Sequence, residues 1–63
     1  MTTAAALTIP ALETVYDSLA EALDRAGEDK VSLFLVKLAL LNANALGDAA
    51  LFREHLALAL RDL

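Results

Sequence analysis

The amino-acid sequence predicts an all-α fold: a small three-helix domain with a largely buried central helix, which pairs with a second copy. The first observation is the segment Val31–Leu46, VSLFLVKLALLNANAL, which is apolar almost all round when it is placed on a helix. The second is that the segments before and after it have apolar residues at the i, i+3, i+4, i+7 spacing of amphipathic helices. The third is that Gly27 and Gly47 separate the three segments at positions where helices commonly end.

The first helix is predicted over Pro10–Ala26, after a flexible N-terminal arm of residues 1–8. The arm is short, small and Ala-rich, which is typical of a frayed terminus. Pro10 is favoured in a first turn because its missing N–H would have no partner there, and Thr8 is placed to cap the helix. Residues 9–63 are therefore expected to form a single three-helix domain.

An acidic stripe runs along the face of the first helix that lies opposite its apolar residues. It consists of Glu13, Asp17, Glu21 and Asp24, at helical spacing. One interpretation is a docking face for a basic protein partner. The other is a solvated face that keeps an apolar protein soluble, which is the usual role of such stripes. Both interpretations stay open at the level of sequence.

The central segment is predicted to be a helix and not a strand, because the run is long and rich in Leu and Ala. A bilayer-spanning helix needs about 20 apolar residues, and Lys37 interrupts the run. Gly27 ends the helix before it, and Glu28 and Asp29 provide acids near its start, where the helix dipole favours them. A soluble helix that is apolar almost all round must be buried on most of its circumference.

The third helix is predicted from Ala49 to about Arg61. Gly47 ends the central helix, and Asp48 is a favourable N-cap for the next one. An apolar stripe then follows at helical spacing. It consists of Phe52, Leu56, Ala59, Leu60 and Leu63.

The apolar content of the chain exceeds what three short helices can hide from water. The chain has 63 residues, 59% of them hydrophobic, and a mean hydropathy of +0.57. A domain of this size buries only about 60% of the surface that its unfolded chain exposes. We therefore expect a homo-oligomer, with a dimer favoured, or a complex with another protein. The residues expected to anchor that interface are Val31, Phe34, Leu35, Leu38, Leu41 and Phe52.

Charge and residue types argue against several classes of function. The net charge is −4, and no basic patch interrupts it, so neither nucleic acid nor an anionic membrane surface is an expected partner. The sequence has no Cys and one His, His55, so no catalytic, cofactor or metal site is predicted. The first residues lack the basic region of a secretory signal, and a cytoplasmic location is expected.

Part of the chain resembles a known family. The block LFLVKLALLNANALGD, followed by LFREHLALALRDL, is similar to a family of short bacterial helical proteins of unknown function, often encoded near FAD-dependent hydroxylases of aromatic compounds. The similarity covers Val15–Leu63 and is clearest where Lys37–Leu41 runs into Asn44–Asp48. The resemblance implies an accessory subunit or partner protein and carries over no catalytic residue.

The sequence therefore supports two hypotheses of function from different classes. The first is a non-catalytic interaction module or accessory subunit that acts through apolar helix faces. The alternative is a small protein that binds or carries apolar ligands in a pocket between its helices. An enzyme is not expected.

Overall fold

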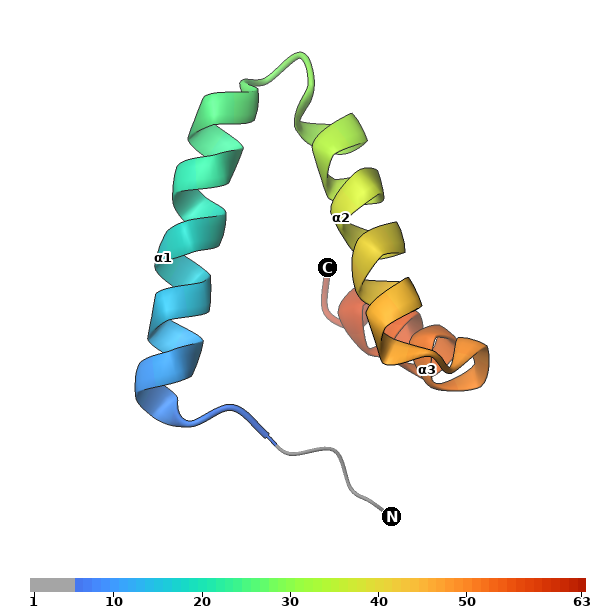
Figure 1. The fold of residues 1–63 in the computed structure, drawn as a ribbon. Helices are drawn as coiled ribbons and strands as arrows, with labels where there is room; N and C mark the ends of the chain where they lie inside the picture. The colour runs from blue at the N-terminus through green and yellow to red at the C-terminus, as the bar shows by residue number, and fades with distance from the viewer. Residues whose placement is uncertain (1–5) are drawn as a thin grey trace. The chain divides into compact units, whose positions relative to one another are not determined.

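The computed structural model describes residues 6–63, which form three α-helices and no strand (Figure 1). The helices are α1 (Ile9–Ala26), α2 (Val31–Leu46) and α3 (Ala49–Leu60). The all-α prediction is confirmed, and each helix begins and ends within one residue of its predicted bounds. Most of the predicted N-terminal arm, residues 1–5, lies outside the described residues.

Two side chains start helices by the mechanism that the sequence predicts. The Oγ1 atom of Thr8 accepts a hydrogen bond from the backbone N–H of Ala11 at 3.2 Å, and Pro10 occupies the first turn of α1. The Oδ1 atom of Asp48 accepts from the N–H of Leu51 at 3.0 Å at the start of α3. Each bond satisfies an N–H that the helix itself leaves without a partner, and contributes about 1 kcal/mol to the stability of the helix.

Two glycines end α1 and α2 in a backbone conformation that other residues rarely adopt. Gly27 has φ 78° and Gly47 has φ 70°. The N–H of Gly27 donates to the carbonyl of Leu23 at 3.1 Å, and that of Gly47 donates to the carbonyl of Ala43 at 3.0 Å. These bonds satisfy carbonyls at the ends of the helices, so both stops are set locally.

The chain divides into two compact units. The first contains α1, and the second begins at Ser32 and contains the rest of α2 together with α3. The prediction that residues 9–63 form a single domain stays a prediction.

In the second unit, only Gly47 and Asp48 separate α2 from α3. One of these residues ends a helix and the other caps the next, so the connection consists of two residues that each have a local role. The axis of α3 turns sharply away from that of α2 at this corner (Figure 1). The corner thereby sets which side of α2 lies against α3.

A substitution at Gly47 tests this account of the corner. A Cβ atom at Gly47 would meet nothing within 4 Å, so only its positive φ opposes a side chain there. We expect Gly47→Ala to lower the free energy of unfolding by about 1 kcal/mol, and Gly47→Asn by less, since Asn tolerates the left-handed region. Thermal unfolding followed by far-UV circular dichroism measures both values. Equal losses for Ala and Asn would contradict a conformational origin.

Candidate interaction surface

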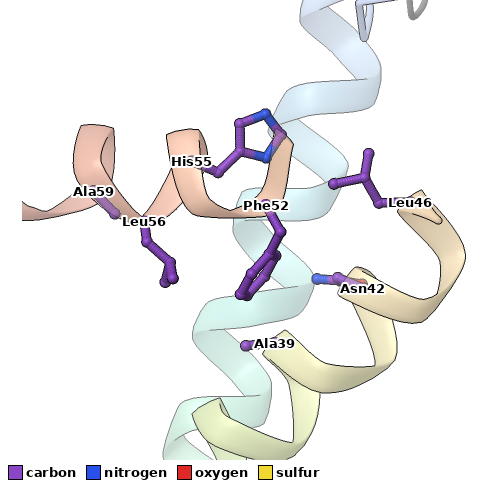
Figure 2. A pocket seen from close by; sticks show the side chains of 7 residues that line it. All are labelled: Ala39, Asn42, Leu46, Phe52, His55, Leu56 and Ala59. Carbon is purple, nitrogen blue, oxygen red and sulfur yellow. The ribbon is translucent and has the colours of Figure 1, made fainter. Parts of the chain in front are cut away.

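An apolar groove lies between α2 and α3. It has a volume of about 400 Å³ and is lined by Ala39, Asn42, Leu46, Phe52, His55, Leu56 and Ala59. Figure 2 shows the ring of Phe52 extending from α3 toward Ala39 and Asn42 of α2, while the imidazole of His55 points away from that ring. The predicted α3 stripe thus contributes Phe52, Leu56 and Ala59 to the groove.

The groove is an open surface, and the helices do not enclose a core. Among residues 6–63 no side chain is buried. Instead, many large apolar side chains in this part of the chain are exposed to water. They are Leu7, Ile9, Leu12, Val15, Tyr16, Leu33, Leu35, Val36, Leu40, Leu41, Leu56, Leu58, Leu60 and Leu63.

The residues of α2 lie on sides that partly overlap when they are placed at 100° per residue. The side toward α3 carries Ala39, Asn42 and Leu46. The α2 residues that the sequence selects as anchors, here called the predicted stripe, span about 120° and overlap that side, since Leu35 falls between Asn42 and Leu46 on the helix. The predicted stripe consists of Val31, Phe34, Leu35, Leu38 and Leu41.

Another side of α2 carries residues that the sequence interpretation did not select. Leu33, Val36 and Leu40, here called the exposed stripe, are 59%, 56% and 64% exposed. They recur at intervals of three and four residues, so they lie within about 60° of one another on the helix. The same spacing is present in the sequence. A helix that is apolar almost all round has several stripes with this spacing, so spacing alone does not select one of them.

The anchors predicted from sequence differ in their exposure. Val31, Phe34, Leu38 and Phe52 are half-buried. Leu35 and Leu41 are 42% and 69% exposed. The structure therefore leaves the exposed stripe more accessible than most of the predicted stripe.

Lys37 lies at the edge of the exposed stripe, where its side chain reaches water. With Leu40, Leu41 and Asn44 it lines a shallow depression of about 370 Å³ on α2. A lysine in this position covers apolar surface with its aliphatic stem while the ammonium group stays solvated. The positive charge of Lys37 is therefore compatible with burial of the apolar side chains that lie beside it on α2.

The acidic stripe of α1 is exposed along its whole length. Glu13, Asp17, Glu21 and Asp24 all lie on the surface of the first unit. In the described part of the chain, no group of three or more His, Cys, Asp or Glu side chains is arranged to hold a metal ion. Over the same residues, no helix combines the length and the apolar character that crossing a bilayer requires.

Comparison of the chain with protein-family models, with curated proteins and with solved structures finds no match.

Replacing Phe52 tests the contact between α2 and α3. Because the ring lies in the groove and is half-buried, we expect Phe52→Ala to lower the free energy of unfolding by about 1–2 kcal/mol. The matched control is Leu58→Ala on the same helix, which removes an exposed side chain outside the groove and should change it by less than about 0.5 kcal/mol. Thermal unfolding gives both values, and equal effects would contradict the assigned packing.

Proposed function

We propose that this chain is a non-catalytic protein–protein interaction module, an accessory subunit that acts through the apolar faces of its helices. The observation that carries the proposal is that no side chain is buried among residues 6–63, while large apolar side chains are exposed on every helix. Burying one Leu fully is worth about 1.5–3 kcal/mol. Because most of these side chains are only about half exposed, covering four or five of them supplies roughly half of that value for each, several kcal/mol, against a net stability of about 5–15 kcal/mol for a small domain.

The partner that we propose first is a second copy of the chain. In such a homodimer α2 becomes the largely buried helix that its apolar sequence requires. Val31, Phe34, Leu35, Leu38, Leu41 and Phe52 stay the anchors that the sequence proposes for the contact, with part of α3 included. The resemblance to the bacterial helical family supports the same accessory role, and a cytoplasmic location stays a prediction.

The acidic stripe of α1 is proposed as a second, weaker docking face for a basic protein. All of the net charge of −4 lies in residues 1–31, since the charges of residues 32–63 cancel. That distribution also supports the absence of nucleic-acid and membrane partners. Contacts between exposed charges weaken as salt is added, so ionic strength separates this face from the apolar one.

A second candidate function is the binding of small apolar ligands in the groove between α2 and α3. Its volume of about 400 Å³ falls within the range of ligand sites, about 300–1,000 Å³. Its lining is mostly aliphatic and aromatic, and Asn42 and His55 are the polar side chains in it. This is the chemistry of a site for a small apolar molecule with one polar group.

The solution mass tests the first proposal. We expect static light scattering across a dilution series to give twice the monomer mass of 6.7 kDa at high concentration, falling toward the monomer on dilution by mass action. A folded monomer at every concentration would contradict self-association and would direct attention to another protein partner.

Thermal unfolding with ligands tests the second candidate. A protein that binds small apolar molecules gains stability in proportion to the logarithm of ligand concentration once its site is nearly saturated. We expect no rise in melting temperature with indole, benzoate or octanoate if the groove serves only protein contacts. A concentration-dependent rise that Phe52→Ala abolishes would favour the ligand-binding function instead.

A further inference from the structure

We draw no further inference here: the strongest candidate, the exposed surface patch on α2 formed by Leu33, Val36 and Leu40, carries none because nothing in the structure shows what covers it.

Discussion

The helix α2 is apolar on most of its circumference, and residues 6–63 form two other helices that could cover it. This apolar circumference constrains the rest of the molecule. The contact with α3 takes the side that carries Ala39, Asn42 and Leu46. The rest of the surface of α2 is largely apolar, and water solvates it poorly. No side chain is buried among residues 6–63. Under the proposed self-association, a second copy of the chain would cover much of this surface.

The helices themselves depend on local chemistry more than on a core. Thr8 and Asp48 cap two of them, and Gly27 and Gly47 end two. Helices of this length are marginal in isolation, because nucleation is costly and packing supplies most of their stability. Local signals therefore determine where the helices begin and end, while packing against other surfaces supplies most of their stability. Under the proposed self-association, folding and binding would be strongly coupled in this chain.

The sequence predicts the helices well because capping and termination are local. All three helices lie within one residue of their expected bounds, since a residue such as Asp48 acts on an N–H only three positions away. The candidate surface was harder to predict. On a helix that is apolar almost all round, hydrophobic spacing supports the predicted stripe and the exposed stripe equally, and Leu40 and Leu41 look alike. What separates them is the side of α2 that lies against α3, which depends on the geometry of the Gly47–Asp48 corner.

The Gly47–Asp48 corner links the length of α2 to the direction in which α3 leaves it. Because α2 ends at Gly47 by a bond to Ala43 and α3 is capped at once by Asp48, the corner keeps its form wherever it stands along the helix. Inserting one residue between the exposed stripe and Gly47 would turn α3 by about 100° around α2. The number of residues in α2 therefore determines which apolar side of α2 packs against α3 and which sides stay exposed. Variants of this chain that differ by one residue here would expose different faces of α2 while keeping the same helices.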